Sequence, residues 1–484
     1  MTLGIIGVYL VLVLGVGLLS HRLFRGTGED YFLATRSIGP FVLLMTLFGT
    51  HMTAFSLLGA SGEAYRRGIG VFSLMASSSA IVVPVVFLFV GVRLWTLGKR
   101  HGFVTQVEYF RERWQSPALG IVLFVVLVAL VVPYLLIGVL GGGLTLSQIT
   151  GGAVPRWAGS LAVSLVVLCY VTFGGLRGTA WANTFQTLVF MTLGAVTFFW
   201  VIGKVGGLQA ALRHAGEFRP ELLVRGERMG WVEMSTYAFI PLSVGMFPHI
   251  FMHWLTARSA AAFRLPVIAY PLCVTVVWLP SVLLGVVGAG QIPGLEAAAA
   301  NSVLVRLIDM HAPDVLAGLL AAGVFAAIMS SLDSQVLSLG TMFTRDVVGR
   351  LRRTPATEGS QVATGRAFVA GILTLTYAIS LFVTPRIFQL AVWSFTGFAG
   401  LFPLAVAALY WRRSTASGAL AAVAAVVGLW LYFFLDGFGV AGYTVAGTGI
   451  MPVAVITVAS AVVLAGVSLL TAAPPPQALA RFFP

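Results

Sequence analysis

Long apolar runs follow one another along almost the whole chain, and short polar segments separate them. Each run is about 20 residues long, the length of an α-helix that crosses the hydrocarbon core of a bilayer. The strands of a membrane barrel would show shorter segments of alternating polarity. The pattern therefore predicts an all-α integral membrane protein with about 13 transmembrane helices. We expect these helices near residues 3–20, 39–61, 70–97, 117–141, 158–174, 181–203, 232–255, 266–289, 313–343, 366–384, 387–411, 415–435 and 449–471.

Composition agrees with this interpretation and indicates no second domain. Of the 484 residues, 58% are hydrophobic and only 9% are charged, and the mean hydropathy is +0.97. Such values are typical of proteins that are embedded in a membrane. Both cysteines, Cys169 and Cys273, fall inside predicted helices, so no disulfide framework is indicated. Residues 1–484 are predicted to form a single transmembrane domain.

The net charge of +13 raises the question of a nucleic-acid partner. The basic residues are spread over the loops and form no patch interleaved with aromatic side chains, so topology and anionic lipid headgroups explain them better. The first span has no basic segment before it and is followed by His21, Arg22 and Arg25, as in a retained signal anchor. We therefore expect the N-terminus outside, the C-terminus with Arg481 in the cytoplasm, and the chain in the plasma (inner) membrane.

Two of the predicted spans are interrupted by glycine, proline and polar residues. The first interruption is Gly49-Thr50-His51-Met52-Thr53, and the second contains Pro241, Gly245 and Pro248-His249. Their spacing fits a five-plus-five inverted repeat over about 39–203 and 232–411, with one extra N-terminal helix and two extra C-terminal helices. A broken helix is tolerated at that depth only where it is buried in protein or lines a cavity. The carbonyl groups that it frees are ligands for a hard cation.

A single carboxylate, Asp333, lies deep in the predicted span 313–343. An ionisable group at that depth is costly and is usually retained for ions, protons or substrate. Ser330, Ser331 and Ser334 surround it within about one helical turn. Serines alone serve equally well in helix packing, but with Asp333 among them they indicate a cation site. Protons stay open as the coupling ion, because a desolvated carboxyl group can hold a proton.

Four stretches, taken together and in order, resemble the sodium/solute symporter family. This family includes the sodium-coupled proline, galactose, sialic acid and pantothenate transporters. The similarity covers the second to the eleventh predicted span, and Pro248-His249 resembles the corresponding site of the proline transporter. The matching stretches are Asp30-Tyr-Phe-Leu-Ala-Thr-Arg36-Ser, Gly59-Ala-Ser-Gly62-Glu-Ala-Tyr65, Tyr170-Val-Thr-Phe-Gly174-Gly175-Leu-Arg177 through Trp181 to Gln186, and Ala326-Ala-Ile-Met-Ser-Ser-Leu-Asp-Ser-Gln335.

The resemblance implies a LeuT-type fold and symport of sodium, as the transported coupling ion, with a small polar or anionic organic solute by alternating access. In the family, a shared sodium site joins carbonyls at the break of the first core helix to a carbonyl and two hydroxyls of the eighth. By position these ligands are Gly49, Met52, Ala327, Ser330 and Ser331. The solute is expected between the broken helices, beside His51, Thr53 and His249.

The chain departs from the family at two positions. Many relatives carry an acid in the sixth span where this chain has Asn183, and Asp333 stands where some relatives have a serine ligand. We therefore predict a second cation or proton site made of Asp333, Ser334 and Asn183. His51 replaces an acid of the proline transporter, which favours an anionic solute. His253 is expected near the cytoplasmic interface, and Glu63, Arg66 and Arg67 are expected to be solvated charges at the outer end.

Other classes of protein fit the sequence less well. An enzyme is not indicated, because neither His-Glu-x-x-His nor Gly-x-Ser-x-Gly is present. A channel would not need a repeat of broken helices around a closed site. A solute sensor that acts through a separate signalling partner stays open, since some family members are fused to kinase modules. We expect a monomer or weak oligomer, and the sequence does not identify the solute.

Overall fold

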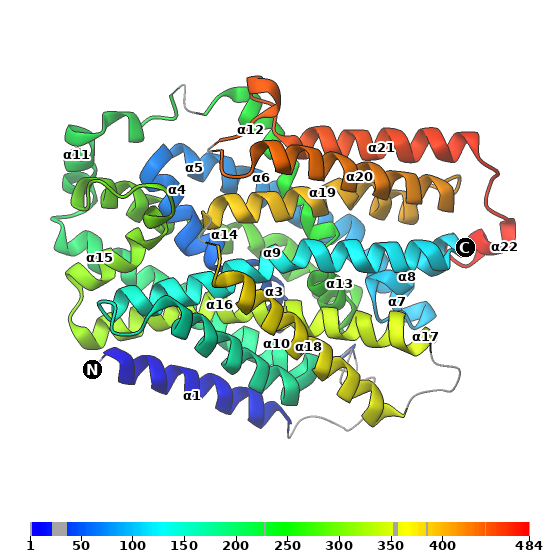
Figure 1. The fold of residues 1–484 in the computed structure, drawn as a ribbon, viewed down its shortest axis with the longest axis horizontal. Helices are drawn as coiled ribbons and strands as arrows, with labels where there is room; N and C mark the ends of the chain where they lie inside the picture. The colour runs from blue at the N-terminus through cyan, green and yellow to red at the C-terminus, as the bar shows by residue number, and fades with distance from the viewer. Residues whose placement is uncertain are drawn as a thin grey trace.

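The structure is a computed structural model that describes residues 2–21, 36–226, 229–351, 357–383, 386–440 and 442–483. Within these ranges the regular elements are all helices, and one isolated bridge joins Ile38 to Ala257. Most helices run along the long axis of the molecule, and the marked ends of the chain lie at opposite ends of that axis (Figure 1). The predicted motif from Asp30 to Thr35 falls outside the described residues.

The described residues contain nine helices that are long and apolar enough to cross a membrane, or up to eleven if each of two bent pairs is one crossing. Two further apolar helices, Thr2–Val16 and Arg156–Thr172, are shorter. Each of these segments overlaps one of the predicted spans. The protein is therefore an all-helical membrane protein with many passes. The nine long helices are Gly70–His101, Pro117–Ile149, Gly178–Lys204, Ala260–Gln291, Asp314–Leu351, Gly359–Ser380, Ile387–Tyr410, Ala416–Gly437 and Pro452–Leu470.

The labels of Figure 1 correspond to the following bounds. The long helices are α1 (Thr2–His21), α9 (Pro117–Ile149), α10 (Arg156–Lys204), α14 (Arg264–Gln291), α16 (Asp314–Met342), α18 (Glu358–Ser380), α19 (Ile387–Tyr410), α20 (Ala416–Gly437) and α21 (Pro452–Leu470). One further pass consists of α5 (Gly70–Phe72), η3 (Ser73–Ser77), α6 (Ser78–Val86), η4 (Phe87–Gly91) and α7 (Val92–His101). The short helices outside the two bent pairs are α8 (Gln106–Trp114), α11 (Leu208–Phe218), α15 (Val303–His311), α17 (Gly349–Leu351) and α22 (Pro476–Ala480).

Helix α10 doubles back on itself although its 49 residues are all assigned as helical. In a straight helix, Tyr170 and Asn183 would stand about 20 Å apart along the axis. Instead, Tyr170 Oη lies 3.1 Å from Asp333 Oδ2, and Asn183 Nδ2 lies 2.8 Å from Ser334 Oγ. Since Asp333 and Ser334 are adjacent, the chain must reverse between Tyr170 and Asn183. This agrees with the prediction of two separate spans in this region.

Helix α16 is the central helix of the bundle. It packs against α1, α3, α9, α10, α13 and α18, and it crosses the middle of the view in Figure 1. In its apolar window 83% of the residues are buried, against 33% for α20 at the edge. Polar side chains in a membrane helix avoid lipid by facing the interior of the bundle. The central place of α16 therefore explains how it carries Ser330, Asp333 and Ser334 without exposing them to lipid.

The end of the bundle near the C-terminus is closed by α8 and by the tail that follows α22, residues 481–483. Arg111 of α8 forms an ion pair with Asp346 at 2.9 Å, and Thr105 donates to the same carboxylate at 2.6 Å. The tail places Phe482, which is 2% exposed, against the rings of Phe103 and Tyr109. These contacts make the tail part of the packed structure.

Candidate functional site

The first broken span consists of α3 (Pro40–His51), followed by η2 (Phe55–Gly59) and α4 (Ala60–Arg67). The two halves meet at an angle of 61°. Met52 has an extended backbone and ends α3, and the Thr53 hydroxyl accepts a hydrogen bond from Phe55 N at 3.0 Å, which starts the next turn. The predicted break at this position is confirmed.

The second broken span consists of α12 (Trp231–Tyr237) and η6 (Ile240–Gly245), followed by α13 (Pro248–Leu255). Its halves meet at 52°. Phe247 is extended, and Pro248 stands at the first position of α13, where its missing N–H costs nothing. This second predicted break is also confirmed, and it places His249 at the start of a helix within the bundle.

Three of the five predicted sodium ligands lie within hydrogen-bonding distance of one another. Ser330 Oγ lies 2.9 Å from Gly49 O and 3.1 Å from Ala327 O. This contact joins α16 to the end of α3. Ser331 instead donates to Ile328 O of its own helix at 3.0 Å, and Met52 is buried at the break with its sulfur 3.1 Å from Ser56 Oγ. The structure thus gathers oxygen atoms around the break, while the side chains of Ser331 and Met52 are hydrogen-bonded to residues outside the predicted ligand set.

Gly49 allows α3 to approach α10 closely. A Cβ atom at Gly49 would lie 2.0 Å from Thr187 Oγ1 and 3.4 Å from Asn183 O. The Thr187 hydroxyl itself donates to Met45 O at 3.0 Å and so belongs to the same contact. Only a residue without a side chain brings the carbonyl group of position 49 within reach of Ser330.

Asp333 is fully buried and forms a hydrogen-bonded cluster with the two residues predicted to accompany it. Its Oδ1 accepts from the backbone N–H of Ser334 and from the Ser334 hydroxyl, the latter at 3.0 Å. Its Oδ2 accepts from Tyr170 Oη at 3.1 Å. Asn183 Nδ2 donates to Ser334 Oγ at 2.8 Å. The cluster therefore joins both arms of α10 to α16.

His253 belongs to this cluster, and the prediction that it lies at the cytoplasmic interface is wrong. It is 1% exposed, and its Nε2 lies 3.0 Å from Ser334 Oγ. The sequence predicts the break of the second span but not that α13 then packs within the bundle against α16. The spacing of His253, one turn after His249, was the available signal. Tyr170 was assigned only to a family motif, and its contact with Asp333 depends on the reversal of α10.

The donors and acceptors at Ser334 determine where the hydrogens of this cluster lie for each protonation state of Asp333. When Asp333 is ionised it only accepts, so the Ser334 hydroxyl donates to it. Ser334 Oγ then accepts from Asn183 Nδ2 and from His253 Nε2, which must carry the ring proton of a neutral imidazole. The reverse pattern, with Ser334 donating to His253, requires a proton on Asp333. Asp333 and His253 are thus linked through one hydroxyl group.

Several buried polar atoms in the described chain have no hydrogen-bond partner around these clusters. Because most buried polar groups in proteins are paired, such atoms indicate places for a ligand, an ion or water. The oxygens among them, those of Thr50, Asn183 and Gln335, suit a hard cation. The unpaired atoms near the breaks and Asp333 are Thr50 Oγ1, Asn183 Oδ1, both ring nitrogens of His249, His253 Nδ1 and both amide atoms of Gln335.

Two of the three predicted solute residues lie around one aromatic ring. The rings of His51 and His249 lie 6.0 and 5.2 Å from the ring of Phe247. His51 Nδ1 is hydrogen-bonded to Tyr270 Oη, whereas His249 has neither nitrogen paired. The Thr53 oxygen accepts from Phe55 N and so caps the following helix. Tyr134 donates to His51 O at 3.3 Å and closes the group.

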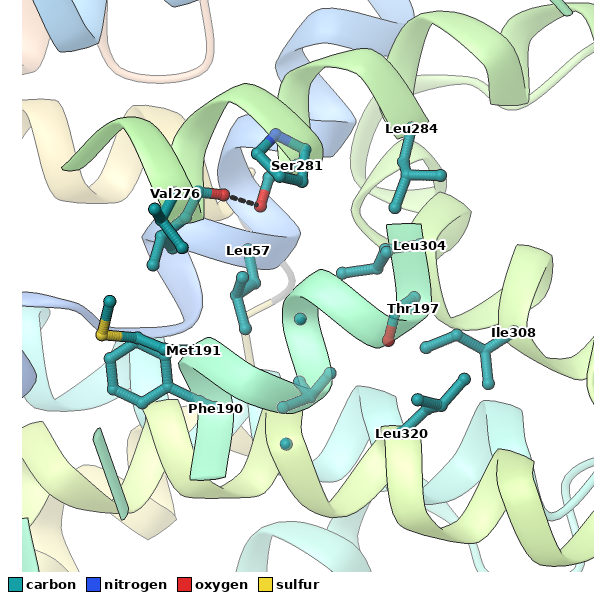
Figure 2. A pocket seen from close by; sticks show the side chains of 15 residues that line it. Leu57, Phe190, Met191, Thr197, Val276, Ser281, Leu284, Leu304, Ile308 and Leu320 are labelled. Carbon is teal, nitrogen blue, oxygen red and sulfur yellow. Dashed lines mark hydrogen bonds between the residues drawn. The ribbon is translucent and has the colours of Figure 1, made fainter. Parts of the chain in front are cut away.

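The pocket in Figure 2 is apolar and lies away from these clusters, between α10, α14, α15 and α16. Its two hydroxyl groups are satisfied within their own helices: Ser281 donates to Val277 O at 2.8 Å, and Thr197 donates to Leu193 O at 2.7 Å. The other side chains that line it are apolar. We therefore do not assign it to transport.

A second cavity lies at the end of the bundle opposite to α8, beside the halves α4 and α12 of the two broken spans. It is lined by Glu63, Arg67, Glu233 and Arg386 together with aromatic residues such as Trp393. Arg67 forms a two-point contact with Glu233 at 2.9 and 2.8 Å, which ties α4 to α12. Glu63 is only 8% exposed and pairs with Arg67 at 3.7 Å. The expectation that these two charges are simply solvated is wrong.

Two broken membrane helices, a central helix with buried oxygen donors and a charged cavity at one end define a protein that moves ions and a solute across a membrane. The described residues hold no group of three or more His, Cys, Asp or Glu side chains suited to a metal ion. The donors here are carbonyls, hydroxyls and a lone carboxylate, which suit a monovalent cation carried as cargo.

Comparison with known proteins gives the same class and makes it specific. A family model described as Sodium:solute symporter family matches residues 31–428, most of the chain. The chain belongs to this family. It is a sodium-coupled solute symporter and not an enzyme, as the resemblance in sequence implied.

Individual relatives are similar over most of their length. The Sodium/pantothenate symporter of Escherichia coli (strain K12) is 28% identical over 440 residues, which are 88% of this chain and 89% of that protein. The Sodium/proline symporter of the same organism is 25% identical over 434 residues, 85% of this chain and 84% of that protein. The solved structure of a Na+-coupled sialic acid symporter has a TM-score of 0.80 at 16% identity and covers 98% of both chains. This last likeness shows the fold.

Proposed function

We propose that the protein imports a small polar or anionic organic solute with sodium, by alternating access of a LeuT-type inverted repeat. The repeats span about 39–203 and 232–411, flanked by one extra helix before them and two after, which makes about 13 passes. The two bent pairs, at 61° and 52°, support this arrangement because they occupy equivalent places in the two repeats. The N-terminus faces outside and the C-terminus the cytoplasm of the plasma (inner) membrane. The ends of the chain lie at opposite ends of the bundle, as this topology requires (Figure 1).

The observation that carries the proposal is the contact between Ser330 Oγ and Gly49 O at 2.9 Å. It places a hydroxyl of the central helix against a carbonyl freed at the end of α3. Sodium bound there contacts both oxygens and replaces the hydrogen bond between them. In the proposed site the remaining ligands are Met52, Ala327 and Ser331. A bound sodium ion therefore holds α3 against α16, and its release frees α3 to move.

We assign a second cation to Asp333, Ser334 and Asn183. Asp333 supplies a full negative charge in the interior, and Asn183 Oδ1 is buried without a partner. A cation at this place compensates the cost of the buried charge. The link between Asp333 and His253 through Ser334 also permits a proton to take this place, which makes proton coupling the alternative at the second site.

We place the solute between the broken helices, beside His51, Thr53 and His249. The unpaired ring nitrogens of His249 support this, because a solute oxygen or N–H group would satisfy them. Thr53 still has its hydroxyl hydrogen to donate although its oxygen caps the next helix. The relatives named for pantothenate and for proline support a small polar solute for this chain.

The test is a thermal-shift screen of the purified protein against pantothenate, L-proline, monocarboxylates and sugar acids, in sodium chloride or in choline chloride. We expect one class of solute to raise the melting temperature in sodium and much less in choline. Stabilisation that is equal in both salts and changes with pH would instead support proton coupling and contradict the proposal.

A further inference from the structure

One helix holds the inner halves of both broken spans through two serines. Ser330 and Ser334 lie one turn apart on α16 and therefore face the same side. Ser330 Oγ contacts Gly49 O at the end of α3 at 2.9 Å. Ser334 Oγ contacts His253 Nε2 on α13 at 3.0 Å. Gly49 lies before the break of the first span and His253 lies after the break of the second, so α16 holds one half of each broken span.

His253 also lies on the helix that carries His249. The two histidines are one turn apart on α13, so they share one face of this short helix. His249 contacts the Phe247 ring in the proposed solute site, while His253 contacts Ser334 in the proposed second cation site. A helix of this length moves as a unit, so a shift at one histidine is felt at the other.

Asn183 provides the link from a cation to His253. Its amide has two ends: Oδ1 is free, and Nδ2 donates to Ser334 Oγ at 2.8 Å. A cation held by Asp333 and Asn183 Oδ1 fixes the amide, and the fixed amide and carboxylate hold the Ser334 hydroxyl in the orientation that accepts from His253. Without the cation only the carboxylate and one end of the amide favour this orientation, and α13 is less firmly held.

We infer that His253 is a positioning residue that couples the second cation site to the solute site, by fastening α13 to α16 when the cation is bound. The inference rests on the proposed function and extends it, since it names the route by which a second cation acts on the solute. Ser330 fastens the first broken span to α16 in the same way, at the first proposed sodium site. His253 makes the attachment of the second broken span depend on the second cation.

Hydrogen exchange of the full chain tests this inference with sodium alone as the probe. The protein is compared in sodium chloride and in choline chloride of equal ionic strength, and exchange is followed in residues 43–52 of α3 and 248–256 around α13. In the wild-type protein sodium slows exchange in both segments. In His253→Ala we expect the slowing to persist in 43–52 and to fall by about fivefold in 248–256, the effect of about one hydrogen bond.

Two conservative variants keep the test decisive if His253→Ala does not fold. In His253→Gln the amide N–H replaces Nε2 and reaches Ser334, so sodium protection of 248–256 is retained. The shorter side chain of His253→Asn does not reach, so protection is lost. His214→Gln on the exposed α11 is the control for the substitution itself and changes neither segment.

The possible results separate the inference from the proposed function. Equal sodium protection of 248–256 in wild type, His253→Ala and His253→Asn would overturn the inference. A wild-type protein in which sodium protects 43–52 but not 248–256 also overturns it and leaves the first sodium site standing. If sodium protects neither segment of the wild-type protein, the proposed sodium sites fail and the inference fails with them.

Discussion

At the scale of single residues, the feature that most distinguishes this chain is the position of its buried acid. Asp333 receives three hydrogen bonds, from Tyr170, from the Ser334 hydroxyl and from the Ser334 backbone. These donors stabilise the anion but leave its charge unbalanced in the described surroundings. A cation is the simplest partner that balances it.

Asp333→Asn tests this residue directly. The asparagine oxygen still accepts from Ser334, its NH2 group donates to the Tyr170 hydroxyl oxygen, and the Tyr170 hydrogen has a second acceptor in Met329 O, so we expect the fold to persist. The charged ligand is lost, and sodium binding should weaken by about tenfold or more, because a hydrogen bond or contact to a charged group contributes about 1.5–3 kcal/mol. The measurement is the sodium concentration that gives half of the maximal thermal shift.

Asp314→Asn is the matched control, since Asp314 stands at the exposed start of the same helix. It should leave the sodium titration unchanged. If Asp333→Asn shows the same sodium dependence and the same transport as wild type, no cation uses this carboxylate.

At the scale of elements, the absence of a side chain at Gly49 allows α3 and α10 to lie close together. We expect Gly49→Ala to lower the free energy of unfolding by about 1–3 kcal/mol, the usual cost of overpacking. The reason is that the added Cβ would lie 2.0 Å from Thr187 Oγ1. The melting temperature in choline chloride is the measurement, because sodium binding does not contribute there.

The neighbouring helix supplies both a rescue and a control for this contact. Thr187→Ala removes the clashing oxygen and should recover part of the loss when combined with Gly49→Ala. Gly194→Ala, on α10, has nothing within 4 Å of its added Cβ and should be neutral. A protein that tolerates Gly49→Ala as well as Gly194→Ala would show that α3 is not held this closely.

The elements themselves were largely predictable from local signals, and their meeting points were not. Proline at position 248 and the glycine and polar residues at 49–53 interrupt a helix wherever it lies, so both breaks follow from sequence. Asp333 and the neighbouring serines could be considered together because one turn of a helix is a local property. His253 and Glu63 were misplaced because their burial depends on which distant element faces them, Ser334 for one and the α4–α12 contact for the other. Sequence position near a helix end does not carry that information.

At the scale of the whole molecule, the outer halves of the two broken spans are joined by charge. Arg67 of α4 binds Glu233 of α12 through two hydrogen bonds at 2.9 and 2.8 Å. The inner halves are joined to α16 by neutral contacts through Ser330 and Ser334. The two ends of the proposed pathway are therefore closed by different kinds of interaction.

In Glu233→Gln we expect the outer end of the proposed pathway to be open for a larger fraction of the time. The ion pair is largely buried, and its loss should raise the accessibility of the cavity by about fivefold, equivalent to roughly 1 kcal/mol. A cysteine at Thr396, which lines this cavity, reports the change through its rate of reaction with a membrane-impermeant maleimide. Cys169 and Cys273, the two native cysteines, are replaced first.

Glu221→Gln removes a more exposed ion pair, with Arg219, and serves as the control. It should leave the rate of labelling unchanged. Equal rates in wild type and Glu233→Gln would mean that the ion pair does not hold the outer end closed.

The packed tail at the other end has a mechanical consequence. Phe482 is seated between Phe103 and Tyr109, and Arg481 binds Glu112 of α8 at 3.1 Å. The same helix contacts η9 (Phe343–Val348), the segment that directly follows α16, through the ion pair of Arg111 with Asp346. A displacement of the tail is therefore passed through α8 to the end of α16, the helix that carries Ser330 and Ser334. The tail is thus connected, through α8, to the helix that carries the proposed ion sites.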